Sequence, residues 1–153
     1  MDNGHWNYKS QIDPEEWFGF IYRIVNEKTG QHYVGKKQFW STNRKVVKGR
    51  KNRKKVIKAS PWKKYTGSCK KLNADIEIFG MANFTFVIES LHESKASLYY
   101  AEVEKQVKED VLRAKMDSGI PKYYNGNIAA VKFIPPSWSD KELESFYSIF
   151  KIT

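Results

Sequence analysis

The sequence is poor in the residues that build disulfides and metal clusters. It has one cysteine, Cys69, and three scattered histidines, His5, His32 and His92. A single cysteine excludes an intramolecular disulfide and a zinc site made of several cysteines, and the histidines form no HxxxH-type pair. No apolar run approaches the roughly 18 residues of a membrane-spanning helix, and the N-terminus lacks the basic and apolar regions of a signal peptide. We therefore expect a soluble, cytoplasmic protein without a membrane partner.

The common catalytic motifs are also missing. The chain contains no GxSxG elbow, no P-loop and no HExxH sequence. These absences argue against serine hydrolases, P-loop nucleotide hydrolases and zinc proteases. No small-molecule substrate is indicated.

Acidic residues are absent from one long stretch. Residues 28–74 contain none of the 17 Asp and Glu residues but 16 of the 27 Lys and Arg residues. The rest of the chain is therefore net negative, so the positive charge is concentrated rather than spread evenly. Such polarity indicates a surface for nucleic acid. On charge alone, a solvated loop or a ribosome-type protein that only binds phosphate remains open.

With 153 residues, 41% of them hydrophobic, the chain suits one domain with a real core. Turn residues separate the segments that favour strands from those that favour helices. We expect an α+β fold, with a small three-stranded antiparallel sheet flanked by helices, a long basic loop and a C-terminal helix. The expected strands are 20–25, 31–35, 83–88 and a short one at 129–134, and the expected helices begin near 13, 68, 94 and 139 and end near 19, 79, 115 and 150. The basic stretch 44–64 is expected to be an extended loop or a loose β-ribbon.

Several side chains define these elements. Gly30 is expected in a left-handed turn between the first two strands, which makes Tyr22 and Tyr33 near cross-strand neighbours. On residue types alone, an aromatic packing pair is the favoured interpretation. Ser68 and Ser94 are the expected N-caps of the second and third helices.

The helix that follows Ser94 is expected to direct one apolar row towards the core. Leu98, Ala101, Val107 and Val111 make up this row. Glu102 then falls at the edge of the row, where an exposed flanking position is favoured over a buried acid.

The order of motifs resembles a known family. Gly19-Phe20-Ile21-Tyr22 and Tyr33-Val34-Gly35 are similar to the paired signature of the GIY-YIG endonucleases. A helix, an F-x-F-x-I strand, a helix with a glutamate one turn after a leucine, and Tyr124-Asn125 follow in that family's order. The resemblance covers residues 18 to 128 and is greatest to the phage-type homing endonucleases. The chain departs from the pattern in having Phe20 in place of the first motif's glycine and no separate DNA-recognition domain.

The resemblance implies a domain plan and an activity. Residues 1–17 would be an N-terminal extension with a short helix, 18–128 the nuclease domain with a basic insertion at 44–64, and 129–153 a tail with a helix. The implied activity is metal-dependent hydrolysis of phosphodiester bonds in double-stranded DNA by a homing-type or nicking enzyme. If a phage encodes the chain, the location would be the host cytoplasm.

The resemblance also assigns roles to single residues. Glu102 would bind Mg²⁺ or Mn²⁺, and Tyr22 would act as the general base with help from Tyr33. Lys36 and Lys37 would favour the phenolate or hold the scissile phosphate.

Two further positions of the family pattern have candidates here. Arg44 is the nearest match to the family's catalytic arginine, although the register of that match is open. Asn125 would support the glutamate and the backbone around it.

The implied DNA-binding surface consists of the bases of the insertion. They are Arg44, Lys45, Lys48, Arg50, Lys51, Arg53, Lys54, Lys55, Lys58, Lys63 and Lys64. The flanking Trp40, Trp62 and Tyr65 would either stack on bases or anchor the ends of the insertion. We expect a monomer or a weak homodimer, the latter through the C-terminal helix with Trp138, Phe146 and Phe150. The alternative to a nuclease is a catalytically inactive module that binds DNA or RNA through the basic insertion.

Overall fold

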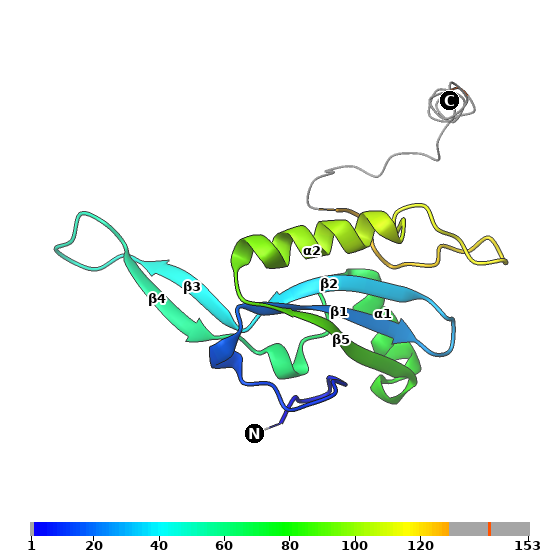
Figure 1. Cartoon of the computed structure of the whole chain (residues 1–153), viewed down its shortest axis with the longest axis horizontal. Coiled ribbons are helices and arrows are strands. Elements are labelled where there is room, and N and C mark those ends of the chain that lie inside the picture. Colours follow the sequence, from blue (N-terminus) through cyan, green and yellow to red (C-terminus); the bar gives the residue numbers. More distant parts are fainter. Residues whose placement is uncertain (1, 129–140, 142–153) are drawn as a thin grey trace, which may run out of the picture.

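The computed structural model describes residues 2–128 and residue 141. Its centre is an antiparallel sheet with the order β2-β1-β5, made of β1 (Gly19–Asn26), β2 (His32–Gln38) and β5 (Phe84–His92). Helix α1 (Lys70–Phe79) and helix α2 (Lys95–Lys108) pack on opposite faces of this sheet (Figure 1). This arrangement confirms the predicted α+β fold with a small antiparallel sheet and flanking helices.

The central strand β1 is buried on both faces, which explains its nearly continuous apolar sequence. Phe20, Tyr22 and Ile24 pack in one cluster with Leu72 of α1. Ile21 packs in a second cluster on the other face with Leu98 of α2. The turn that leads to β2 has Gly30 at a φ of 81°, in the left-handed region that was predicted for it.

The N-terminal residues also contribute to the core. Trp6 and Ile12 are buried, and the ring of Trp6 contacts the rings of Phe20 and Tyr22. A single 3-10 turn, η1 (Pro14–Glu16), follows and is capped by the Asp13 side chain. The short helix expected near residue 13 is therefore only this turn.

Each of the two helices differs from the expectation at one end. Cys69, not Ser68, is the N-cap of α1, and it makes no side-chain capping hydrogen bond. Ser94 caps α2 as predicted, its Oγ accepting a hydrogen bond from the Ser97 N–H. However, α2 ends at Lys108 rather than near residue 115. Val107 is 61% exposed instead of facing the core, because it lies on the side of α2 opposite Leu98.

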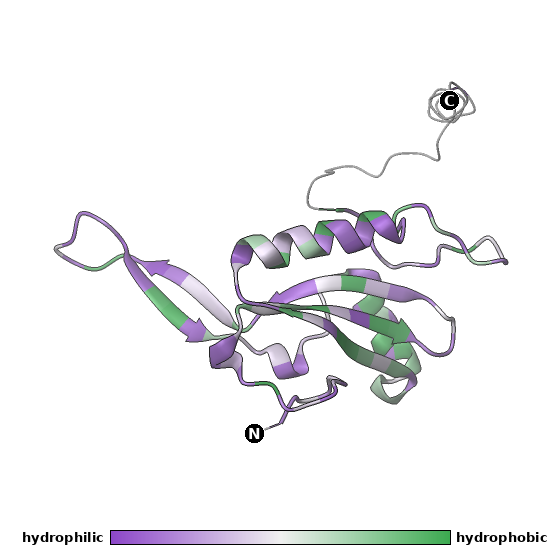
Figure 2. Ribbon diagram, in the orientation of Figure 1, coloured by the Kyte–Doolittle hydropathy of each residue, from purple (hydrophilic) through white to green (hydrophobic). Residues whose placement is uncertain are grey.

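The basic stretch forms a two-stranded antiparallel ribbon. Strands β3 (Trp40–Lys45) and β4 (Lys54–Ala59) pair with each other and with no other strand of the described residues. The ribbon extends away from the three-stranded sheet (Figure 1), and its surface is mostly hydrophilic (Figure 2). Of the two forms expected for residues 44–64, the ribbon is the correct one, and the long loop is limited to the tip between the strands.

Two further 3-10 turns complete the helices and strands of the described residues. They are η2 (Trp62–Lys64), which follows the ribbon, and η3 (Met81–Asn83), which precedes β5. The expected strand at 129–134 and the helix expected from 139 lie outside the described residues. Within the part of the chain that is described, no helix has the length and apolar character needed to cross a membrane.

Candidate active site

A cavity of about 290 Å³ lies at the outer edge of β2, and residues from both faces of the sheet line it. Tyr22 and Lys37 reach it from one face, and Lys36 and Glu102 reach it from the other. A second cavity of about 390 Å³ shares Tyr33, Lys36 and Glu102 with the first. The structure therefore brings together five residues that the sequence analysis singled out, although they lie on both faces of the sheet.

Tyr22 is almost fully buried, with 1% of its surface exposed. It pairs in register with Gly35, and a Cβ added to Gly35 would lie 2.6 Å from the Tyr22 hydroxyl oxygen. Only glycine leaves room for this ring. Burial raises the pKa of Tyr22 well above its ordinary value, and the neighbouring Tyr33, Tyr65 and Glu102 raise it further. The free protein therefore holds this hydroxyl protonated.

Tyr33 lies diagonally across the strand pair from Tyr22, because its direct partner in the register is Ile24. The centroids of the two tyrosine rings are 6.1 Å apart. Burial raises the pKa of Tyr33, although a hydrogen bond with Ser68 opposes the shift. The two tyrosines are thus neighbours, as predicted, and both hydroxyls are neutral near pH 7.

Glu102 is a buried acid rather than an exposed flank, with 8% of its surface exposed. Its Oε1 accepts a hydrogen bond from the Lys36 ammonium at 2.9 Å. The ammonium of Lys36 also lies 4.3 Å from the centroid of the Tyr99 ring. The buried side of α2 carries Leu98, Glu102 and Gln106. Two of these residues are polar, although the buried side of an amphipathic helix normally carries apolar residues.

Lys37 lies on the tyrosine side of the sheet. Its ammonium is 4.1 Å from the centroid of the Tyr65 ring, and burial lowers its pKa. Lys37 therefore lies beside the tyrosine cluster, whereas Lys36 pairs with Glu102 on the other face of the sheet.

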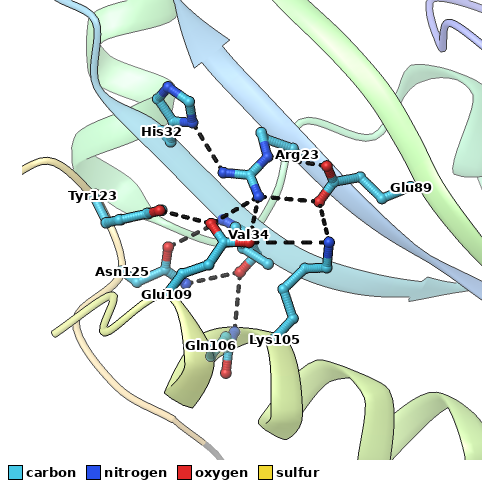
Figure 3. Close-up of polar contacts among 9 residues, drawn as sticks. All are labelled: Arg23, His32, Val34, Glu89, Lys105, Gln106, Glu109, Tyr123 and Asn125. Carbon is cyan, nitrogen blue, oxygen red and sulfur yellow. Dashed lines mark hydrogen bonds and ion pairs between the residues drawn. The ribbon is translucent and has the colours of Figure 1, made fainter. Parts of the chain in front are cut away.

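Asn125 is buried and pairs with the backbone of β2 (Figure 3). Its Oδ1 accepts a hydrogen bond from the Val34 N–H at 3.0 Å, and its Nδ2 donates to the Val34 carbonyl at 2.7 Å. Gln106 of α2 donates a second hydrogen bond to the same carbonyl at 3.0 Å. Asn125 therefore fixes the strand that carries Tyr33, Gly35 and the two lysines.

An ion-pair cluster beside this contact connects four segments (Figure 3). Arg23 of β1 binds Glu89 of β5 and Glu109 after α2, and Glu109 accepts a hydrogen bond from the Tyr123 hydroxyl at 2.6 Å. Lys105 binds Glu89 at 2.9 Å. The segment that ends in Asn125 is thus attached to both β1 and α2.

Sequence reasoning did not assign Tyr65 and Ser68 to the site. Tyr65 is hydrogen-bonded to Tyr22, and Ser68 to Tyr33, and both line the first cavity. The backbone between them passes close to the tyrosines, because a Cβ on Gly67 would lie 3.1 Å from the Tyr33 ring. The sequence signal for these two residues is the segment Tyr65-Thr66-Gly67-Ser68, which directly follows the basic stretch 44–64.

Arg44 lies on the ribbon and lines neither of the two cavities. Trp40 and Ser41, at the base of the same strand, do line the first one. The remaining DNA-binding candidates lie along the ribbon, its tip and the turn after it, and all but Lys63 are exposed. The Lys63 ammonium lies 3.9 Å from an Asp2 oxygen, and Trp62 is buried in the core beside it. Trp62 thus anchors the end of the basic stretch.

The described residues contain no cluster of three or more His, Cys, Asp or Glu side chains that could hold a metal ion. Among the described residues, Glu102 is the only carboxylate that lines the two cavities. Mg²⁺ commonly binds through one or two carboxylates, completed by water and substrate phosphate. The donor set therefore fits a magnesium-type ion whose other ligands are water or phosphate oxygens, and it does not fit zinc.

Comparison with known proteins identifies a family for most of the chain. Residues 5–128 match the family model described as "Putative endonuclease segE, GIY-YIG domain". No curated protein and no solved structure matches the chain. The matched region includes both tyrosine motifs, Glu102 and Asn125, together with the N-terminal residues that pack on the sheet. The chain belongs to the GIY-YIG endonuclease family.

Proposed function

We propose that this protein is a divalent-metal-dependent endonuclease that hydrolyses phosphodiester bonds in double-stranded DNA, as a nicking or homing-type enzyme. The observation that supports the proposal is the shared cavity of Tyr22, Lys36, Lys37 and Glu102 at the base of the basic ribbon. Cleavage needs a positioned water, a cation near the phosphate oxygens and stabilisation of the leaving oxygen. In this cavity the Tyr22 hydroxyl would position the water, the Glu102 carboxylate would bind the metal ion, and the two lysines would contact the phosphate.

Glu102 is the proposed ligand of Mg²⁺ or Mn²⁺. When bound, such an ion supplies Lewis-acid stabilisation of charge on the phosphate. Lys36 already pairs with one oxygen of the Glu102 carboxylate and so orients this side chain at the cavity. Asn125 and Gln106 support the site by fixing the strand that carries Lys36.

Tyr22 is the proposed general base, with Tyr33 as its assistant. The raised pKa of Tyr22 means that the hydroxyl is neutral before substrate arrives, because burial disfavours the phenolate. Its oxygen would orient the attacking water through a hydrogen bond. Because duplex DNA is negatively charged, loss of the tyrosine proton would require a nearby cation, which the bound divalent ion would supply.

Lys36 and Lys37 are the proposed contacts to the scissile phosphate, because they are the cations that line the first cavity. Arg44 and the lysines of the ribbon are proposed to bind the flanking phosphates of the duplex. These contacts would release counterions and make binding strongly salt-dependent.

The test is incubation of supercoiled plasmid with Mg²⁺, Mn²⁺ or EDTA. The wild-type protein should convert the plasmid to nicked circles with either metal and not with EDTA. Glu102→Gln and Tyr22→Phe should each lower the rate at least about 100-fold, as expected for loss of a group that acts in the transition state. Glu104→Gln is the matched control, because this glutamate is exposed on the same helix.

Two outcomes would contradict parts of the proposal. Gel shifts without cleavage under either metal would favour a catalytically inactive DNA-binding module. Linear product whose rate rises with the square of the protein concentration would show that two molecules cut together.

A further inference from the structure

The ribbon has features that core packing does not explain. From Thr42 to Lys45 on β3 every residue is exposed, and on β4 only Val56 is partly buried. An isolated two-stranded hairpin is marginally stable in water. A protruding ribbon of this kind, with no acid on either strand, therefore suits a role in contact with an anionic partner.

The register separates the ribbon into two faces. Ser41, Asn43 and Lys45 lie on one face, opposite Lys58, Val56 and Lys54 respectively. Thr42 and Arg44 lie on the other face, opposite Ile57 and Lys55. Ser41 of the first face and Trp40 of the second both line the first cavity, so the ribbon as a whole continues directly from the candidate active site.

The centre of this first face is the cross-strand pair of Asn43 and Val56, and lysines occupy the pairs on either side. In the major groove an A·T base pair presents N6 and N7 of adenine beside the methyl group of thymine. An asparagine amide binds N6 and N7 with two hydrogen bonds, and an apolar side chain contacts the methyl group. Directly opposed residues on a ribbon have Cβ atoms about 5 Å apart, which suits one base pair.

We infer that the face made of Ser41, Asn43, Lys45, Lys54, Val56 and Lys58 enters the major groove of duplex DNA and selects an A·T base pair next to the cut. The groove is about 12 Å wide and admits a two-stranded ribbon. Asn43 lies two residues beyond Ser41, or about 7 Å along the strand. With a rise of about 3.4 Å per base pair, the selected pair lies within about three base pairs of the scissile phosphate. This inference deepens the proposed function, on which its link to the cut site rests.

Selecting the DNA sequences that the protein binds tests the inferred recognition of an A·T base pair without requiring cleavage. Glu102→Gln protein in Mg²⁺ is equilibrated with a library of duplexes that carry a randomised central segment, and the bound fraction is sequenced. We expect an enrichment of A·T of at least about fivefold at one position, the lower end of what a bidentate base contact gives. Adding Asn43→Ala should remove this enrichment, whereas adding Thr42→Ala on the opposite face should leave it unchanged. An enrichment that survives Asn43→Ala, or no enrichment at all, would overturn the inference.

Cleavage of the same library by the wild-type chain locates the pair. The position should lie within about three base pairs of the mapped ends. A preferred pair a full helical turn away would overturn the inference. If the wild-type protein does not cut but the Asn43-dependent selection persists, the proposed nuclease function fails and the base reading stands. Equally tight binding to duplex RNA, whose major groove is too narrow for a ribbon, would also count against it.

Discussion

The ring of Tyr22 lies against the α-carbon of Gly35 on the neighbouring strand. A Cβ at Gly35 would be 2.6 Å from the Tyr22 oxygen and 2.8 Å from the ring carbon that carries it. The glycine of the second motif therefore makes room for the tyrosine of the first. The two three-residue motifs form one packed unit.

Gly35→Ala should displace the Tyr22 ring. We expect a loss of about 1–3 kcal/mol in the free energy of unfolding, as for other overpacked sites, together with loss of cleavage. Urea unfolding and the plasmid assay measure the two effects. Gly49→Ala is the control, because a Cβ there meets nothing within 4 Å and costs only the strain of its positive φ. Equal activity of the two variants would refute the packing argument.

Lys36→Met should alter metal binding and cleavage in opposite directions. Without its ammonium partner at 2.9 Å, Glu102 presents an uncompensated charge, so the affinity for Mn²⁺ in the absence of DNA should rise at least about threefold. Cleavage should fall because a cation of the cavity is lost. Calorimetric titration measures the affinity, and Lys95→Met is the control, since this exposed lysine lies near the same Tyr99 ring. A reduced affinity for Mn²⁺ would contradict the predicted role of Lys36.

Asn125→Asp should destabilise the outer edge of β2. The aspartate still accepts from the Val34 N–H, but it cannot donate to the Val34 carbonyl at 2.7 Å. We expect a loss of about 1–3 kcal/mol at pH 7, measured by urea unfolding. Asn127→Asp, at an exposed position nearby, should change stability by less than about 0.5 kcal/mol.

Stability should fall in acid because of the cluster around Arg23. Burial opposes ionisation of Glu89 and Glu109, but hydrogen bonds and charge from Arg23 and Lys105 outweigh it and lower the pKa of both carboxyls. A lowered pKa in the folded state adds stability above the unfolded value of about 4.3, and this stability is lost as the pH falls through the folded value. Glu109→Gln should flatten the fall between about pH 5 and pH 3, whereas Glu93→Gln at an exposed site should not. Unfolding in urea at several pH values provides the measurement.

The salt dependence of DNA binding should depend on the ribbon. Each phosphate contact contributes about 0.9 to the slope of log K against log salt concentration. Replacing Lys54 and Lys55 with glutamine should therefore reduce the slope by up to about 1.8. Replacing Lys108 and Lys115, which are exposed beyond the site, should leave it nearly unchanged. Identical slopes for the two double variants would place the DNA elsewhere.

The hairpin and the two main helices could be predicted because local chemistry determines them. β-branched and aromatic residues favour β1, Asn26 and Gly30 set the turn, and Ser94 caps α2. The early end of α2 could not be predicted, because it depends on Asp110 at a φ of 53° and on Arg23 binding Glu109. Arg23 and Glu109 are far apart in the sequence, so local sequence patterns do not reveal their contact.

The site was harder to predict than the fold. The family pattern assigned two tyrosines, two lysines, Glu102 and Asn125 to the site, whereas hydrophobic periodicity favoured an exposed Glu102. Burial of this acid depends on Lys36, which lies on a strand far away in the sequence. Tyr65 and Trp6 were not found as neighbours of Tyr22, because both lie in segments with no regular pattern.

The contacts of two asparagines have a consequence for self-association. At the β2 edge, Asn125 occupies the Val34 N–H and carbonyl groups. At the β5 edge, the Asn7 backbone accepts from the Ile88 N–H and donates to the Phe86 carbonyl. Unpaired strand edges are templates for pairing with a second chain and for fibrous aggregation. Asn7 and Asn125, which lie near the two ends of the matched region 5–128, thus oppose the addition of a further strand to either edge of this small sheet.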